Sequence, residues 1–192
     1  MFETGISPEL YQIQGKSYDF PDMTNKLCPH CKGDYLKKHG FYKRYLVTIA
    51  FEGEIIIRRH YCKECERTVS LLPSFCHPRR TYGVLVIFGL LKTFYIKMSS
   101  VCTGVINFYI ATGVECSRQL LLHYRTRVEQ NLNSLIMAVT DIYGLKAPII
   151  TKRAETTREK VRQLLSRIQY PQDDSLKIFE RTGASYLTKQ AS

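Results

Sequence analysis

Long apolar runs are missing from this chain. The longest, Tyr82 to Leu91, has ten residues, whereas a helix needs about 18 or more apolar residues to cross a bilayer. We therefore expect no membrane-spanning segment. No export signal is recognisable in the first residues, and seven cysteines in such a chain favour a reducing cytoplasm.

Acidic residues are scarce, with 17 Asp and Glu against 28 Lys and Arg. Metal-assisted phosphoryl or DNA-strand chemistry needs carboxylates gathered at one site. After Glu66 only eight acids follow, and none ends a hydrophobic strand, where a nuclease core of the RNase H type would place it. P-loop, G-x-S-x-G and G-x-G-x-x-G patterns are absent as well. These absences predict a protein that is not an enzyme.

Positive charge is what the chain has in excess. The formal net charge is +11, and residues 26–82 alone hold twelve Lys and Arg against five acids. A surface of this sign attracts polyanions, which means DNA, RNA or anionic membranes.

Four cysteines organise this basic segment. Cys28-Pro29-His30-Cys31 and Cys62-Lys63-Glu64-Cys65 are two C-x-x-C pairs with thirty residues between them. Each pair can sit on a tight turn that aims two thiolates at one point, and two such turns supply the four ligands of a tetrahedral structural Zn²⁺ site. Because four cysteines leave no open coordination position, we expect the metal to hold the fold rather than to catalyse.

Other assignments of these cysteines remain open. They could form disulfides or a redox pair, although no βαβ pattern accompanies them. One of the nearby histidines could replace a cysteine as ligand; these are His30, His39 and His60.

The residues between the pairs predict a hairpin. We expect strands at Tyr35–Val47 and Ile55–Tyr61, a turn near Glu52-Gly53, and a bulge at Gly40. A third short strand should follow Cys65 and stop at Pro73, with a linker at 73–81. Together these elements describe a zinc ribbon.

From Tyr82 the apolar period changes to about 3.6 residues. We expect a buried helix at 82–97, a second from Val101 to Ala111 capped by Ser99 or Ser100, and a third from Ser117 to Val139. Gly113 suits the left-handed position that ends the second helix. A helix, a glycine turn and a helix at this spacing are typical of a helix-turn-helix. Cys76, Cys102 and Cys116 are expected to be small buried or half-buried residues.

Two sets of side chains are candidates for contacts with double-stranded DNA. On the ribbon, basic residues interleaved with aromatics suit phosphates; they are Lys37, Lys38, Lys43, Arg44, Arg58 and Arg59. On the polar side of the third helix, four residues suit base edges; they are Arg118, Gln119, His123 and Arg127. Solvation of a sheet and of a helix surface is the alternative in each case. His77-Pro-Arg-Arg80 also matches the short H-x-x-R fragment of tyrosine recombinases.

The end of the chain predicts an amphipathic helix at 151–169, capped by Thr156 or Thr157, and then a turn at 171–174. The expected organisation is α+β, with a small β zinc ribbon followed by a helix-turn-helix-like α bundle and a C-terminal helix. Its expected parts are an arm at 1–25, the ribbon at 26–76, the helical domain at 82–140, and the last helix and tail at 150–192.

Three stretches of the ribbon carry a family resemblance: Cys28-Pro-His-Cys31, His39-Gly-Phe-Tyr-Lys-Arg-Tyr45, and Tyr61-Cys-Lys-Glu-Cys-Glu-Arg-Thr68 continuing through Ser70-Leu-Leu-Pro-Ser-Phe75. They resemble the zinc-ribbon front ends of bacterial insertion-sequence transposases. The chain is also similar to a family of short, uncharacterised bacterial proteins that look like such a front end without the catalytic domain. The resemblance in motifs covers about residues 26–80. Over residues 81–135 only the pattern of helices is similar.

The resemblance implies DNA binding within a mobile element by an accessory or regulatory protein. Strand transfer is not implied, because the acidic catalytic core is missing, so a separate transposase or recombinase chain would have to supply it. We expect a cytoplasmic, nucleoid-associated protein and a possible homodimer. The alternatives are a protein-docking ribbon of a larger nucleic-acid assembly, a transcriptional regulator, or RNA binding by the aromatic ribbon.

Overall fold

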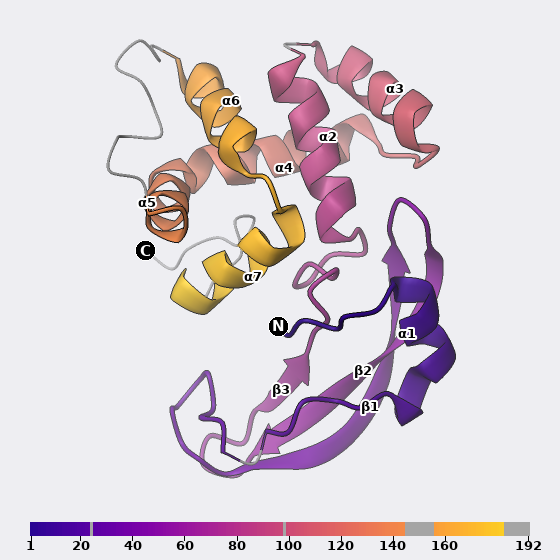
Figure 1. The fold of residues 1–192 in the computed structure, drawn as a ribbon, viewed down its shortest axis with the longest axis vertical. Helices are drawn as coiled ribbons and strands as arrows, with labels where there is room; N and C mark the ends of the chain where they lie inside the picture. The colour runs from indigo at the N-terminus through magenta and orange to yellow at the C-terminus, as the bar shows by residue number, and fades with distance from the viewer. Residues whose placement is uncertain (24, 98, 145–155, 183–192) are drawn as a thin grey trace. The chain divides into compact units, whose positions relative to one another are not determined.

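A computed structural model describes residues 1–23, 25–97, 99–144 and 156–182 (Figure 1). A three-stranded antiparallel sheet precedes a series of helices, so the fold class is α+β as predicted. The chain divides into two compact units, Met1–Tyr82 and Gly83–Ser192. Within the described ranges, no helix combines the length and apolar character needed to span a membrane.

The sheet of the first unit has the order β1-β2-β3, with strands β1 (Leu36–Val47), β2 (Glu52–Cys62) and β3 (Thr68–Leu71). The predicted third strand is confirmed by its pairing with β2. The turn between β1 and β2 was expected near Glu52-Gly53, which is wrong, because both residues already belong to β2. Thr48 closes the turn instead: its backbone N–H donates to the Phe51 carbonyl at 2.7 Å, and its hydroxyl accepts from the Phe51 N–H at 2.9 Å.

The bulge predicted at Gly40 is present. The pairing of β1 with β2 shifts register between Lys38 and Phe41. Gly40 has a φ of 88°, in the region that favours glycine because a Cβ would crowd the backbone there.

The N-terminal arm contains a helix that the sequence reading missed, α1 (Pro8–Gln14), and a 3₁₀ turn, η1 (Gly15–Ser17). Ser7 caps α1 and Pro8 takes its first position, which is a favoured place for proline. The arm packs on the ribbon: fully buried Tyr11 donates its hydroxyl hydrogen to the Ile56 carbonyl at 2.9 Å. The core around it is rich in aromatic and branched side chains: Phe2, Leu46, Phe51, Ile55, Ile57, Leu71 and Phe75.

The second unit is built around α2 (Val84–Ile96), which buries eight of its thirteen residues. A helix that is apolar on all sides needs partners on all sides. It packs against α3 (Val101–Thr112), α4 (Arg118–Gln130), α6 (Thr157–Arg167) and α7 (Pro171–Thr182), while α5 (Leu132–Ile142) packs on α6 and α7.

Three helix ends follow the sequence closely. The Ser100 hydroxyl accepts the Thr103 N–H and begins α3, and Gly113, at φ 73°, ends it. The Ser117 hydroxyl accepts the Leu120 N–H and begins α4. These caps satisfy backbone groups that a helix end leaves without partners.

The single helix predicted from Ser117 to Val139 is wrong. The helix breaks at buried Asn131, which separates α4 from α5. Apolar residues at three- and four-residue steps are nevertheless buried on both sides of the break; they are Leu121, Tyr124, Val128, Leu132, Leu135 and Val139. Periodicity located the buried side chains but could not show a change of helix direction.

The C-terminal prediction is half right. Thr156 caps α6 as expected, accepting the Glu159 N–H at 3.2 Å, whereas residues 151–155 and 183–192 lie outside the described ranges. The turn expected at 171–174 is instead the first turn of α7. Buried Asp174 accepts the Tyr170 N–H at 3.3 Å and the Tyr143 hydroxyl at 2.6 Å, which ties this helix start to α5.

Candidate metal centre and basic surface

The two C-x-x-C turns are built alike. The N–H of Cys28 donates to the Gly33 carbonyl at 2.7 Å, and the N–H of Cys62 donates to the Arg67 carbonyl at 2.9 Å. The residue after the second cysteine of each pair has a left-handed backbone, with φ 64° at Lys32 and 55° at Glu66. A non-glycine residue costs roughly 1–2 kcal/mol in that conformation, so two unrelated segments share one strained geometry.

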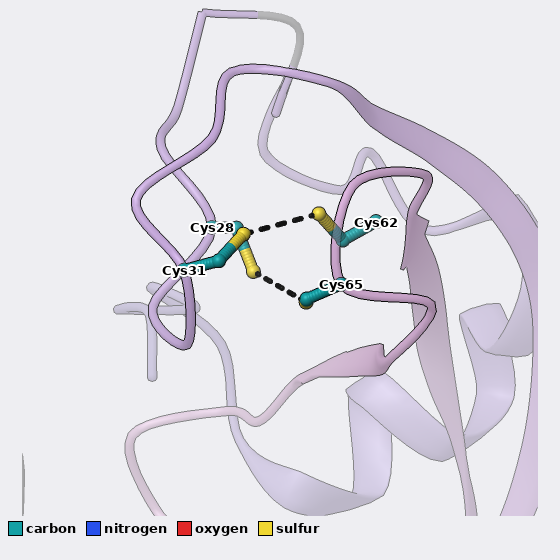
Figure 2. Close-up of side chains that lie close together, drawn as sticks. All are labelled: Cys28, Cys31, Cys62 and Cys65. Carbon is teal, nitrogen blue, oxygen red and sulfur yellow. Dashed lines mark hydrogen bonds between the residues drawn. The ribbon is translucent and has the colours of Figure 1, made fainter.

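This geometry brings four sulfurs together (Figure 2). The Sγ atoms of Cys28 and Cys65 are 3.8 Å apart, those of Cys31 and Cys62 are 3.6 Å apart, and all four lie within 4.8 Å of one another. A tetrahedron with metal–sulfur bonds of about 2.3 Å has edges of about 3.8 Å. A disulfide needs about 2.05 Å, and all seven cysteines are free. The four cysteines can therefore hold a metal ion.

The thiols of the cluster differ in acidity: at Cys31 the Gly33 N–H lowers the pKa, but burial and the three other thiols outweigh it and raise that pKa to about 12. Burial raises the pKa of Cys28, but N–H groups of Cys31 and His30 and the neighbouring thiols outweigh it and lower that pKa to about 7. The Gly33 N–H donates to the Cys31 sulfur at 3.4 Å. Cys28 and Cys62 are fully buried, whereas Cys31 is exposed. The centre thus has an inner side packed on Leu36 and an outer side open to solvent.

The histidines are not part of this cluster. In the portion of the chain that the structure describes, the four cysteines are the one group of three or more metal-ligating side chains. His30 and His39 are exposed, and His60 is buried on β2 opposite Lys38 and Val69. The remaining thiols differ: burial raises the pKa of Cys76 to about 12 and that of Cys116 to about 11, whereas Cys102 is exposed, contrary to expectation.

The three predicted ribbon lysines lie on β1 and are exposed. Lys37 lies over the Tyr61 ring at 5.6 Å, and Lys43 pairs with Glu54 at 2.8 Å. Both members of that pair are more than half exposed, which makes the pair weak.

The three predicted ribbon arginines are more enclosed. Arg58 lies 5.3 Å from the Phe20 ring centre and 5.2 Å from that of Phe41. Arg59 lies 5.7 Å from the Tyr42 ring centre. Arg44 donates to the backbone carbonyls of His77 and Arg80, so its charge holds the 77–80 segment in place.

The four residues proposed to read bases occupy α4. Arg118 and Gln119 are exposed near its start, and His123 and Arg127 are half-buried further along. The Arg118 guanidinium reaches the Cys102 sulfur at 3.5 Å, which links α4 to α3.

The sequence reading treated residues 73–81 as a linker and assigned no function to Arg79 or Arg80. Both line an open groove in the first unit, next to Tyr42 and Tyr45. The adjacent arginines were the available signal. The match to the H-x-x-R fragment is not supported as a catalytic pair, since His77 is 1% exposed and burial lowers its pKa to about 4.

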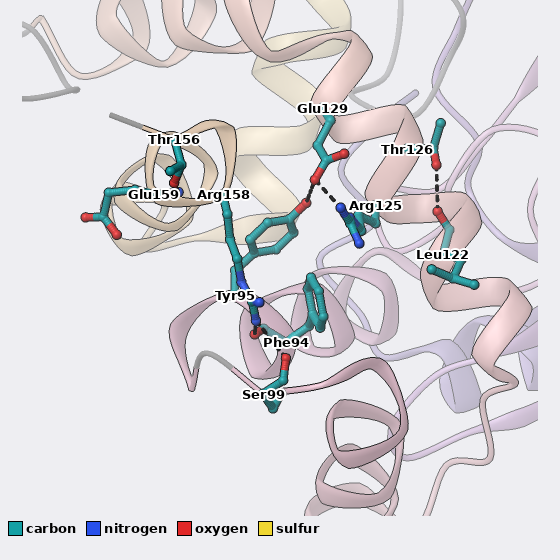
Figure 3. Close-up of polar contacts among 10 residues, drawn as sticks. All are labelled: Phe94, Tyr95, Ser99, Leu122, Arg125, Thr126, Glu129, Thr156, Arg158 and Glu159. Carbon is teal, nitrogen blue, oxygen red and sulfur yellow. Dashed lines mark hydrogen bonds and ion pairs between the residues drawn. The ribbon is translucent and has the colours of Figure 1, made fainter. Parts of the chain in front are cut away.

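Two charged side chains of the second unit, Glu129 and Arg158, make contacts between helices (Figure 3). One Glu129 oxygen accepts from the Tyr95 hydroxyl and from the Arg125 Nε, both at 2.9 Å. Arg158 donates to the Ser99 carbonyl at 2.7 Å while its guanidinium stacks 4.6 Å from the Phe94 ring centre. These contacts join α4 and α6 to the end of α2.

One protein family matches the chain. It is described as a domain of unknown function (DUF6431), and the match covers residues 28–102. The matched segment begins at the first cysteine of the cluster and includes the whole sheet and α2. No curated protein and no solved structure matches the chain.

Proposed function

We propose that this chain is a zinc-dependent, non-catalytic DNA-binding protein that serves as an accessory or regulatory component of a mobile genetic element. The observation that carries the proposal is the four-sulfur cluster, with its near-tetrahedral spacing, at one end of a basic sheet. A structural metal fixes a small sheet, and the sheet presents cations to a polyanion.

Zinc is the metal that this donor set fits best. Thiolates are soft ligands, and an S₄ tetrahedron suits Zn²⁺ or an iron–sulfur centre. Backbone N–H groups of the first turn donate to the Cys28 and Cys31 sulfurs and would stabilise the charge of metal-bound thiolates. Metal analysis of the purified protein, together with the thiolate-to-metal absorption of a Co²⁺-substituted sample, would identify it. A substoichiometric metal content after purification in zinc would contradict the assignment.

DNA recognition would combine two surfaces. Lys37, Lys38 and Lys43 would contact phosphates, which gives affinity without sequence information. On α4, Arg118 and Gln119 are the most exposed candidates for base edges. Strand cleavage and transfer would belong to a separate transposase or recombinase chain, and the protein would act in the cytoplasm at the nucleoid.

A competition titration tests the proposal. Zinc-loaded protein is titrated by fluorescence anisotropy against labelled genomic duplexes, random duplexes and single-stranded RNA, between 50 and 200 mM salt. Tight, salt-steep and chelator-sensitive binding to a few duplexes supports DNA reading. A preference for single-stranded RNA, or equal binding to every duplex, contradicts it.

Paired variants separate the two surfaces. Arg118→Ala should reduce discrimination between specific and random duplexes by roughly 10-fold or more, as expected for loss of a base contact. The charge-matched Lys37→Ala should weaken both duplexes alike and lower the salt slope by about one. Equal effects of the two substitutions would remove α4 from the base-reading role.

One observation favours a second candidate, self-association through a protein contact. The twelve residues of α3 include no charged side chain, yet Ile106, Tyr109 and Ile110 are 56%, 50% and 75% exposed. Two chains with a net charge of +11 repel each other, and contact through an uncharged helix avoids placing like charges together. A second copy of this chain is therefore the partner that the α3 surface fits.

Sedimentation equilibrium tests this second candidate. Ile110→Glu should convert a dimer into a monomer. Ile13→Glu is the control, because Ile13 is 78% exposed but lies outside α3, and this substitution should leave the dimer intact. A monomeric wild-type protein at tens of micromolar would exclude the contact.

A further inference from the structure

We propose that the groove beside the 77–81 segment is a binding site for the phosphodiester backbone of DNA. It has a volume of about 570 Å³ and lies between β1, β3 and residues 78–81. The inference rests on the proposed DNA-binding function and gives it a site that the sequence reading did not include.

The lining of the groove offers donors and no carboxylate. Arg44, Arg79 and Arg80 supply three guanidinium groups, and two tyrosines, two threonines and a serine add hydroxyls. None of the ten lining side chains, all of them in the described part of the chain, is acidic. Phosphate oxygens only accept hydrogen bonds, and arginine binds them in pairs. The chemistry of the wall is therefore complementary to a phosphodiester.

The sheet adds a fourth cation beside the groove. Arg59 is the direct partner of Ser70 across β2 and β3, so the two side chains lie on the same face. The Arg59 guanidinium stacks on Tyr42, another residue of the wall, and its buried Nε has no hydrogen-bond partner among the described residues. A buried donor without a partner is unfavourable, and an anion entering from the groove is a natural acceptor for this group.

The segment that carries Arg79 and Arg80 is fixed before any ligand binds. Arg44 donates to the carbonyls of His77 and Arg80, and the Val47 N–H donates to the Thr81 carbonyl at 3.0 Å. Fixing a binding segment in advance lowers the entropy lost on association.

Arg79 occupies a backbone position where glycine would be less strained. Its φ is 60°, and its side chain is exposed. The chain therefore keeps a long cation at a left-handed residue that lines the groove. This placement suits contact with an external anion better than it suits packing.

The size of the groove favours a polymer backbone over a free ion. Its volume exceeds that of a single phosphate, and Leu72 and the tyrosine rings provide apolar surface between the donors. Sugar rings between successive phosphates fit such an alternation.

The test uses the full zinc-loaded chain and a labelled 20-bp random duplex. The groove variant is Arg79→Gln with Arg80→Gln, and the control is Lys16→Gln with Lys26→Gln, two exposed lysines of the same unit that lie outside the groove. Both variants lose two positive charges. We expect the groove variant to bind at least 10-fold more weakly and to lower the salt slope by about two, while the control changes affinity less than 3-fold.

A second variant checks the site without removing an arginine. Ser70→Asp places a carboxylate in the groove and should weaken duplex binding at least as much, with an unchanged zinc content as the measure of folding. Equal losses of affinity in the groove and control variants would show that the groove is not the site of duplex binding, although the protein binds DNA. Tighter binding of a labelled polyglutamate peptide than of duplex would likewise exclude the groove as a phosphodiester site. Absence of salt-dependent duplex binding by the wild-type chain would instead overturn the proposed function itself.

Discussion

The two units of this chain bury their side chains to very different extents. Strand β1 buries two of its twelve residues, whereas helix α2 buries eight of its thirteen. At the cysteine end of the sheet, the buried cluster contains only Cys28, Leu36 and Cys62. Apolar burial is the main favourable term in folding, so the second unit can stabilise itself while the cysteine end of the first cannot.

A metal ion held by the four cysteines would stabilise the first unit where its core is thinnest. Where the N-terminal arm packs on the sheet, the first unit has a buried aromatic core, in which Tyr11 packs on Tyr18, Phe20 and Phe75. The cysteine end has four clustered cysteines in place of that core. Small modules with few buried residues usually require a metal or disulfides for stability.

Removal of a metal ion bound to the four cysteines should destabilise the first unit far more than the second. Structural zinc contributes on the order of 10 kcal/mol of folding free energy to small modules. We expect chelation, or Cys62→Ser, to abolish amide protection in hydrogen exchange at the cysteine end of β1 and β2, around Leu36 and Cys62, and to leave α2 protected. Cys102→Ser, at an exposed cysteine outside the cluster, is the control. Retention of protection at this end of β1 and β2 in the metal-free protein would contradict a structural metal.

The opposite perturbation is a cavity in the second unit. Leu91 is fully buried in α2, so Leu91→Ala should lower the free energy of unfolding of the helical unit by about 3 kcal/mol. Leu85→Ala, at a 37% exposed position of the same helix, should cost less than about 1 kcal/mol. Urea unfolding followed by circular dichroism at 222 nm measures both. If zinc affinity fell along with helix stability in Leu91→Ala, the units would not be independent.

Acid should weaken the first unit through His77. Burial lowers its pKa to about 4, so between pH 6.5 and 4 the unfolded chain binds a proton that the folded chain does not. Stability therefore falls as the pH falls, by about 2 kcal/mol between pH 7 and pH 5.

The His77 contribution is isolated by comparison with a variant. His77→Gln should lose this part of the pH dependence, while the exposed His39→Gln should keep it. Urea midpoints of the zinc-loaded proteins at pH 7 and pH 5 provide the measurement. Identical pH dependence in the wild-type and His77→Gln proteins would show that the dependence has another source.

The smallest expected effect concerns the polar contact that joins α4 to α2. Tyr95→Phe removes the hydrogen bond to Glu129 but leaves Arg125 on the same oxygen. We expect a loss of about 1 kcal/mol in the second unit, and no change for Tyr170→Phe, whose side chain is 64% exposed. Thermal unfolding of the two variants in parallel resolves the difference.

Much of this architecture could be predicted because it depends on local chemistry. The two C-x-x-C pairs, the glycine bulge at Gly40 and the caps at Ser100, Ser117 and Thr156 are found where the sequence indicates them. In each case a short segment fixes its own backbone geometry.

The errors have a different origin. The hairpin turn lies earlier in the chain than predicted, because the Thr48 side chain closes it. The predicted long helix is two helices, which meet at the buried Asn131. Residues 171–174 resemble a turn in sequence but begin a helix, because the hydroxyl of Tyr143, the residue just after α5, donates to the Asp174 carboxylate. Propensity is a weak guide where a tertiary contact supplies the missing partner.

The sequence alone determined which four cysteines can hold a metal ion, the positive charge and the periodic burial of the helices, because composition and spacing act over a few residues. The tertiary structure alone decided which cations meet. Arg44 lies 36 positions before Arg80 in the chain, and Arg79 is the neighbour of Arg80. The pairing of β1 and the hydrogen bonds of Arg44 nevertheless bring all three to one groove. Side-chain proximity of this kind depends on long-range strand pairing and loop closure, which no local pattern encodes.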